Sequence, residues 1–261
     1  MIKKTDRLFL LPAALGLLVF WVIPFFASLG YAFIDNNFAR RFVGLQNLGA
    51  VLENSYFRLA IKNTMLFSLC AVVLVMVLSV VIAFLIAKYA VRWNFLRGSL
   101  FLPVLLPSAT IVMFWHAYFA EMSPFSSLLA MFLWKYLGLN VMLILTAVVA
   151  VPRELSDAAQ IDGAGAVKTH LLVILPYITP SLFFTLILSF VNSMKIYREL
   201  FLLYGSYPDE SIYMLQNYLD NHFGKLNSPT ISSAAILFAV VIYVIVGVVY
   251  LLEKRWEDRI W

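Results

Sequence analysis

The sequence predicts an all-α, polytopic membrane protein with six transmembrane helices, and three observations support this fold class. Of the 261 residues, 63% are hydrophobic and 13% are charged, against about a quarter charged in an ordinary soluble domain. Six apolar runs are long enough to cross a bilayer as helices, which takes roughly 20 residues each. These runs are continuous rather than alternating, which argues against an outer-membrane β-barrel. A soluble enzyme or binding domain is excluded, because it would expose far too much apolar surface.

We expect one domain over residues 1–261, with helices at about Leu8–Phe33, Lys62–Lys88, Gly98–Phe119, Phe125–Val151, Leu175–Tyr204 and Thr230–Leu252. The first helix follows a basic start as a signal peptide would, but its apolar run is too long for one, so we expect it to be retained. Prolines inside the first, third and fifth helices free backbone carbonyls that neighbours or a wet cavity must satisfy.

The connections between these helices carry their own signals. A short basic connection, Lys88–Arg97, is expected between the second and third helices. A tight turn is expected around Glu121–Pro124, and a short amphipathic helix around Ile212–His222, before the last span.

The basic residues indicate orientation rather than a polyanion partner. The formal net charge is +5. With both termini in the cytoplasm, eleven of the 19 Lys and Arg residues lie inside and seven outside, with Lys135 within a span. Because cytoplasmic loops carry an excess of Lys and Arg, we expect cytoplasmic N- and C-termini and no nucleic-acid partner.

Motifs for catalysis are absent from the sequence. It holds no G-x-x-x-x-G-K-[ST] loop for ATP, no Cys/His metal spacing, no G-x-S-x-G and no H-E-x-x-H. We therefore expect no catalytic residue, no metal and no enzyme activity in this chain.

The inside connection over residues 152–170 has the strongest pattern. Pro152 suits the first turn of a helix, and Glu154 and Asp157 suit its positive end. Asp162-Gly163 is a turn signal, after which a second helix runs to Pro176. Small residues line this segment and permit another backbone to approach closely. From composition alone, a mere connecting hairpin is the favoured interpretation.

The order of residues in this connection resembles the signature loop of permease subunits of binding-protein-dependent ABC importers. That signature is Glu-Ala-Ala, three residues, Gly, nine residues, then Ile-x-Leu-Pro. Here it reads Asp157-Ala158-Ala159, three residues, Gly163, nine residues, then Val173 to Pro176. The departures are Asp157 for Glu and Val173 for Ile.

The remainder of the chain resembles the maltose-type carbohydrate permeases of that group. The matching segments are Val43–Leu48, Asn63-Thr64, Leu102-Pro103, Pro107-Ser108, Trp134-Lys135 and Gly138. The sequence departs from the family's Gly-Gly-Pro turn after the fifth helix, where it has Gly205-Ser206-Tyr207-Pro208.

The resemblance implies the type I ABC importer transmembrane-domain fold and a set of functional residues. The 152–170 loop would be a coupling helix that inserts into a groove of an ATPase subunit. Its coupling residues would be Asp157, Ala158, Ala159, Asp162 and Gly163. The family's sugar-contacting positions fall on Lys135, Tyr136, Ser189, Asn192, Ser193 and Ile196.

The same resemblance implies the partners and the location. These are a second homologous permease subunit, two ATPase subunits, an extracytoplasmic solute-binding protein, the lipid of the cell (plasma or inner) membrane and a carbohydrate substrate. This chain would hold no cofactor, because ATP and Mg would bind the partner ATPase.

Several alternatives stay open at this point. Lys135 indicates an acidic or strongly hydrogen-bonding ligand, but an ion pair with Glu199 explains it equally well. The solute of an importer could be an amino acid or a polyamine. An ion-coupled secondary transporter using Lys135 and Glu199 and a structural membrane scaffold are alternatives from other classes.

Overall fold

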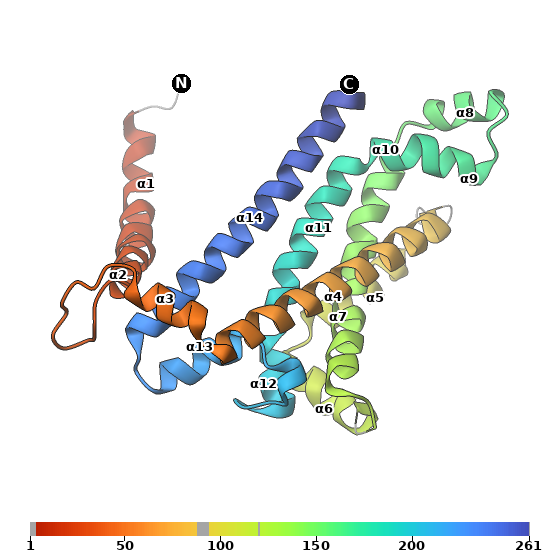
Figure 1. The fold of residues 1–261 in the computed structure, drawn as a ribbon. Coiled ribbons are helices and arrows are strands. Elements are labelled where there is room, and N and C mark those ends of the chain that lie inside the picture. The colour runs from red at the N-terminus through yellow and green to blue at the C-terminus, as the bar shows by residue number, and fades with distance from the viewer. Residues whose placement is uncertain (1–3, 88–93, 120, 261) are drawn as a thin grey trace. The chain divides into compact units, whose positions relative to one another are not determined.

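The computed structural model describes residues 4–87, 94–119 and 121–260, and these are mostly helical (Figure 1). Contacts divide the chain into two compact units, Met1–Ile61 with Leu215–Ile242, and Lys62–Met214 with Tyr243–Trp261. Two of the three boundaries fall within long helices, α4 (Ser55–Ala87) and α14 (Ser228–Ile260), and the third lies just before Leu215. Residues 88–93, the larger part of the expected basic connection Lys88–Arg97, lie outside the described residues.

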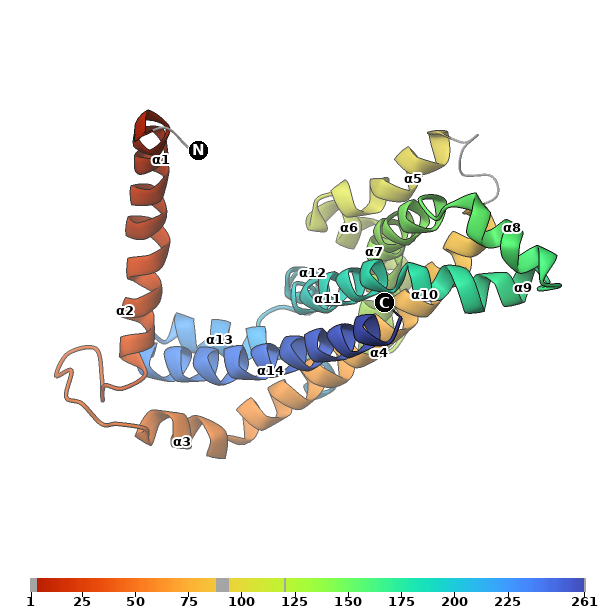
Figure 2. The same cartoon turned by 90° about the horizontal axis from the view of Figure 1, so that it is seen from above.

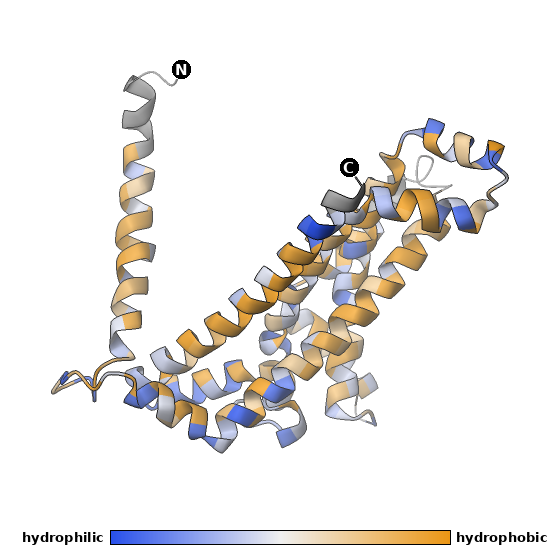
Figure 3. Ribbon diagram, turned by 45° about the horizontal axis from the view of Figure 1, so that its top comes forward, coloured by the Kyte–Doolittle hydropathy of each residue, from blue (hydrophilic) through white to orange (hydrophobic). Residues whose placement is uncertain are grey.

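The described helices fit the membrane fold that the composition predicts. Those long and apolar enough to cross a membrane are Leu11–Tyr31, Ser55–Ala87, Pro124–Val149, Thr179–Tyr204 and Ser228–Trp256. A bent pair, Gly98–Leu105 with Ser108–Phe119, makes the sixth span if it is taken as one. Figure 3 shows apolar residues along most of the length of α4 and α14.

The expectation of one continuous helix over Gly98–Phe119 was wrong. The structure has α5 (Asn94–Leu105) and α6 (Ser108–Phe119), which meet at an angle of 94°. Pro107 lacks an N–H group and disfavours helical geometry at the residue before it, so the helix ends there. After the bend, α6 packs against α12 (Tyr197–Tyr204) (Figure 2).

Two other prolines each follow a π-helical segment. A π-helical segment, η1 (Leu18–Val22), lies just before Pro24, and another, η2 (His170–Ile174), lies just before Pro176. In each case the N–H of the residue preceding the proline reaches back five residues, to the carbonyl of Leu18 or His170. The wider turn makes room for the proline ring, which would otherwise clash with the carbonyl four residues earlier.

The first unit contains α1 (Lys4–Leu17), η1, α2 (Ile23–Tyr31), α3 (Gln46–Glu53), α13 (Leu215–Gly224) and parts of α4 and α14. The amide of Asn47 donates to the carbonyls of Ala32, at 2.9 Å, and Ile34, at 2.7 Å, and so fixes the chain after α2. Helix α13 confirms the expected amphipathic helix, displaced slightly toward the C-terminus from Ile212–His222. Its Tyr218 ring packs edge-on against Phe57 at 5.4 Å.

The second unit is built around α7 (Pro124–Val149). The elements that follow it are α8 (Arg153–Ile161), α9 (Ala166–Thr169), η2, α10 (Leu175–Tyr177), α11 (Thr179–Met194), α12 and η3 (Glu210–Ile212). Phe67 of α4, Phe132 of α7 and Leu200 of α12 belong to one buried apolar cluster. Ala83, Ile144 and Ile178 belong to a second. Helix α7 therefore contributes to the core along its whole length.

Helices α7 and α5 approach each other closely at Gly138 and Leu100. A Cβ atom added to Gly138 would lie 2.0 Å from the backbone oxygen of Leu100. Backbone atoms cannot move aside as a side-chain tip can, so only a residue without a Cβ fits here.

We predict that Gly138→Ala lowers the free energy of unfolding by about 1–3 kcal/mol, the usual cost of overpacking. The measurement is thermal unfolding in detergent, where the variant should melt well below the wild type. Gly247→Ala in α14 is the matched control, because a Cβ there meets nothing within 4 Å. Equal melting temperatures for the two variants would contradict the close packing of α5 on α7.

Candidate functional site

A helical hairpin follows α7 and begins with α8. Pro152 occupies the position just before α8, with extended geometry, one residue earlier than its expected place in the first turn. Glu154 lies in the first turn, where its charge complements the positive end of the helix. The hairpin lies beyond the end of α7 that is remote from α6 (Figure 1).

The turn between α8 and α9 depends on Gly163. Its φ is +79°, a region that side-chain-bearing residues avoid. The N–H of Gly163 donates to the carbonyl of Gln160 at 3.0 Å, and the N–H of Ala164 donates to that of Ala159 at 2.9 Å. These two bonds form a Schellman motif, which satisfies carbonyls that the helix end would leave free. The expected turn at Asp162-Gly163 is confirmed.

The five predicted coupling residues all lie on α8 or at its end. Asp157, Ala158, Asp162 and Gly163 are exposed, and Ala159 is half-buried. Apolar neighbours are exposed as well, Ile161 at 87% and Val167 at 72%. The hairpin formed by α8 and α9 therefore exposes acidic, small and apolar residues.

The second arm anchors this hairpin to the helices. Thr169 is buried and its hydroxyl donates to the carbonyl of Gly165 at 3.3 Å. The His170 ring packs edge-on against Phe84 of α4 with 5.0 Å between centroids. The contact between His170 and Phe84 joins the second arm to α4.

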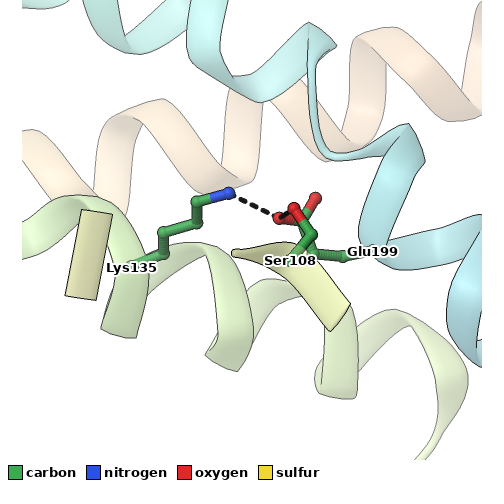
Figure 4. Close-up of polar contacts among 3 residues, drawn as sticks. All are labelled: Ser108, Lys135 and Glu199. Atoms are coloured by element: carbon green, nitrogen blue, oxygen red, sulfur yellow. Dashed lines mark hydrogen bonds and ion pairs between the residues drawn. The ribbon is translucent and has the colours of Figure 1, made fainter. Parts of the chain in front are cut away.

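A buried ion pair lies near the middle of α7 (Figure 4). The ammonium Nζ of Lys135 is 2.5 Å from Oε1 of Glu199 on α12, and the hydroxyl of Ser108 on α6 donates to the same oxygen at 2.7 Å. The side chains are 11% exposed for Lys135 and 1% for Glu199. Three helices are therefore joined by one carboxylate, and the ion-pair alternative for Lys135 is confirmed.

Further contacts, between uncharged polar side chains, lie along α11. The amide of Asn140 on α7 donates to the hydroxyl of Ser189 at 2.6 Å, which donates in turn to the carbonyl of Thr185. The hydroxyls of Ser193 and Ser68, on α11 and α4, are 2.9 Å apart. The amide oxygen of Asn140 is buried without a partner, and so one acceptor stays open on α7.

The structure places the six predicted substrate-path residues in three different environments. Ser189, Asn192 and Ser193 are buried polar residues on one helix. Tyr136 and Ile196 instead belong to the apolar cluster around Phe132, and Lys135 is engaged by Glu199.

Ser68, Ser108 and Asn140 were not predicted as site residues from the sequence. For Ser108 the signal was its place directly after Pro107, where a new helix starts. Asn140 had a weaker signal, a polar residue five positions after Lys135 in an apolar run.

A cavity of about 410 Å³ lies beside Ser68, between α4, α11 and α14 in the second unit. Ser68 and Phe190 line it together with aliphatic side chains such as Leu69, Val72 and Val246. Its walls are mainly apolar, so they suit an acyl chain or another helix better than a hydrated solute.

Comparison with known proteins gives matches over most of the chain. Residues 82–258 match the family described as "Binding-protein-dependent transport system inner membrane component". The probable starch degradation products transport system permease AmyD of Thermoanaerobacterium thermosulfurigenes is 24% identical over 95% of this chain and 94% of its own length. The multiple sugar-binding transport system permease MsmF of Streptococcus mutans is 25% identical over 92% and 91%.

A solved structure shows the same fold. A chain of a bacterial ABC transporter involved in the import of the acidic polysaccharide alginate superposes with a TM-score of 0.80 at 20% identity. The superposition covers 97% of this chain and 96% of the other. The expected transmembrane-domain fold of an ABC importer is therefore confirmed.

The buried ion pair leads to a stability prediction. Lys135→Met leaves the carboxylate of Glu199 buried without its cation, which costs about 3–5 kcal/mol. Lys135→Met/Glu199→Met removes both charges and should recover most of that loss, because an apolar pair can replace a buried ion pair. Thermal unfolding of both variants in detergent checks this, and a double variant less stable than the single one would contradict the pairing.

Proposed function

This chain belongs to the family of binding-protein-dependent transport system inner membrane components, and from that premise we propose that it is one permease subunit of an ATP-driven carbohydrate importer. The family match, which includes the whole α8–α9 hairpin, is the observation on which the importer role rests. The solutes for which these relatives are named, starch degradation products and multiple sugars, support a carbohydrate. As a member of this family, the chain is a multi-pass component of the inner membrane.

The hairpin of α8 and α9 is the proposed contact with the ATPase. Ile161 and Val167 are large apolar side chains exposed beyond the membrane-spanning helices, and a protein partner would cover them favourably. Ala158 and Ala159 let that partner's backbone come close, while Asp157 and Asp162 offer acidic contacts at the rim. Gly163 holds the turn that sets the orientation of α8.

The proposed transmission of force follows from the anchoring of the hairpin. Closure of an ATPase dimer would displace α8, and the packing of His170 on Phe84 would pass the motion to α4. The chain itself would bind no nucleotide, and ATP and Mg would be held by two ATPase subunits. A second permease of similar fold and a solute-binding protein would complete the importer.

The proposed path for the solute runs along the polar side of α11. Ser189, Asn192 and Ser193 supply hydroxyl and amide groups of the kind that hydrogen-bond sugar hydroxyls. Lys135, Tyr136 and Ile196 would support this side from within the protein, since the first is paired and the others are packed. The cytoplasmic placement of both termini is part of this proposal and puts the hairpin on the ATPase side.

An ion-coupled secondary transporter is less well supported. It needs Lys135 or Glu199 to bind and release an ion, yet the two groups satisfy each other within the protein. This alternative also does not explain the hairpin of α8 and α9.

Affinity purification from solubilised membranes tests the importer assignment. We expect a P-loop ATPase, a second six-helix permease and a solute-binding protein to co-purify with this chain. Cross-linking from a cysteine placed at Asp157 should capture the ATPase, whereas one placed at Tyr243, exposed on α14, should not. A homo-oligomer that captures no ATPase at Asp157 would contradict the assignment.

The turn at Gly163 gives a prediction about coupling. Gly163→Val forces a β-branched residue into positive φ, so α8 should lose its orientation and uptake should fall at least about tenfold at normal expression. The reconstituted complex should retain ATP hydrolysis.

Gly165→Val is the matched control, because Gly165 has a φ of −69° that valine adopts readily, and a Cβ at either glycine meets nothing within 4 Å. Unchanged uptake by Gly163→Val would contradict the role of the turn. An equal loss in both variants would show that added bulk matters rather than backbone geometry.

A further inference from the structure

We propose that the loop of residues 35–42 anchors this chain in the headgroup region of the bilayer, where the rings of Phe38 and Phe42 insert between phospholipids and the side chains of Arg40 and Arg41 bind their phosphates. The inference goes beyond the proposed function and depends only on the membrane location of the chain, so it can fail without affecting the transport assignment. The ligand is phospholipid rather than another protein.

The exposed side chains of this loop are the first part of the argument. Phe38 is 97% exposed and Phe42 is 79% exposed. Two exposed cations, Arg40 and Arg41, lie between them in the sequence. Segments that lie in a membrane interface combine such groups, because the rings leave water while the cations contact the phosphates. The composition of the loop therefore suits a position among lipid headgroups.

Hydrogen bonds within the loop fix its backbone. One carboxylate oxygen of Asp35 accepts from the backbone N–H groups of Asn36, at 2.7 Å, and Arg41, at 2.9 Å. The amide oxygen of Asn36 accepts from the N–H groups of Phe38, at 2.9 Å, and Ala39, at 2.7 Å. With its backbone groups satisfied in this way, the loop presents the two rings outward instead of packing them against the chain.

Two membrane spans set the level of the loop. It begins at Asp35, shortly after the span Leu11–Tyr31 ends. The amide of Asn37 donates to the carbonyl of Leu226 at 2.9 Å, and Leu226 lies just before the span Ser228–Trp256 begins. Figure 3 shows the loop running sideways from the end of α2. The loop therefore lies where both helices leave the apolar core of the bilayer.

The surface around the loop has the same apolar and basic character. In the turn before α14, Phe223 is 68% exposed and Leu226 is 75% exposed, and Lys225 between them is exposed as well. The neighbouring span, Leu11–Tyr31, has no buried residue. A single adjacent helix would cover only one side of this span, so lipid reaches the loop along the other sides.

Charge complementarity favours phospholipid as the occupant. Residues 36–52 and 221–252 contain Arg40, Arg41 and Lys225 but no Asp or Glu. Phospholipid phosphates are negative, and an anionic leaflet attracts basic groups that lie next to a span. A docking protein with an acidic surface would also accept these cations, but the level of the loop and its exposed rings place it against the bilayer.

Photo-crosslinking identifies the occupant directly. The photoreactive amino acid p-benzoyl-phenylalanine replaces Phe38 in the full chain, which is assembled with its membrane partners and the solute-binding protein in proteoliposomes of equal phosphatidylglycerol and phosphatidylethanolamine. After illumination, mass spectrometry of the peptide that carries the probe should find phospholipid adducts. The matched control is the same probe at Tyr207, an aromatic residue that is 71% exposed in a connection beside Asp209 and Glu210, and it should yield at least about fivefold fewer lipid adducts.

The headgroups of the captured lipids test the two arginines. With the probe at Phe38, phosphatidylglycerol adducts should exceed phosphatidylethanolamine adducts by at least about fivefold, because each basic group near the surface attracts anionic lipid. Arg40→Gln/Arg41→Gln should bring this ratio close to that of the lipid mixture. Lys195→Gln/Arg198→Gln removes two exposed cations from the second unit and should keep the wild-type ratio.

Three results would overturn the inference. Capture of the solute-binding protein in place of lipid at Phe38 would identify the loop as a docking surface for that protein. Capture of neither would place the ring in water. An unchanged headgroup ratio in Arg40→Gln/Arg41→Gln would refute the contacts with phosphate.

Discussion

The buried ion pair between Lys135 and Glu199 constrains how the helices of the second unit are placed. Two charges buried among apolar helices are tolerated only when they are in contact and further hydrogen-bonded. The 94° bend at Pro107 starts α6 at Ser108, which donates to the shared oxygen, and the break after Met194 starts the helix that carries Glu199. α6, α7 and α12 are thus held together by a contact that apolar packing alone would not specify.

Backbone geometry imposes the other main constraints, at single residues. Gly138 lets α5 pack directly against α7. Gly163 reverses the chain after α8 through a backbone conformation that other residues avoid. Pro107 bends its span, whereas Pro24 and Pro176 each follow a π-helical segment. The membrane fold thus combines many interchangeable apolar residues with a few positions where one residue type is required.

The sequence predicted the features that depend on local pattern. Long apolar runs located the spans, and Asp162-Gly163 located the turn that ends α8. The bend at Pro107 was missed, because a proline within a span is compatible with a straight, kinked or broken helix, and the packing of α6 on α12 decides among them. The ion pair was one of two alternatives for Lys135, since 64 residues separate its members and only the tertiary fold brings them together. Asn140 was missed because a single amide in an apolar run has no partner until α11 is placed beside it.

Uptake by the purified complex in proteoliposomes shows whether this chain conducts a solute for a separate ATPase. The measurement compares accumulation with ATP present and ion gradients collapsed by ionophores against accumulation with gradients present and ATP absent. We expect uptake in the first condition, dependent on the solute-binding protein, and none in the second. Uptake that follows the ion gradient and ignores ATP would contradict it and identify a secondary transporter.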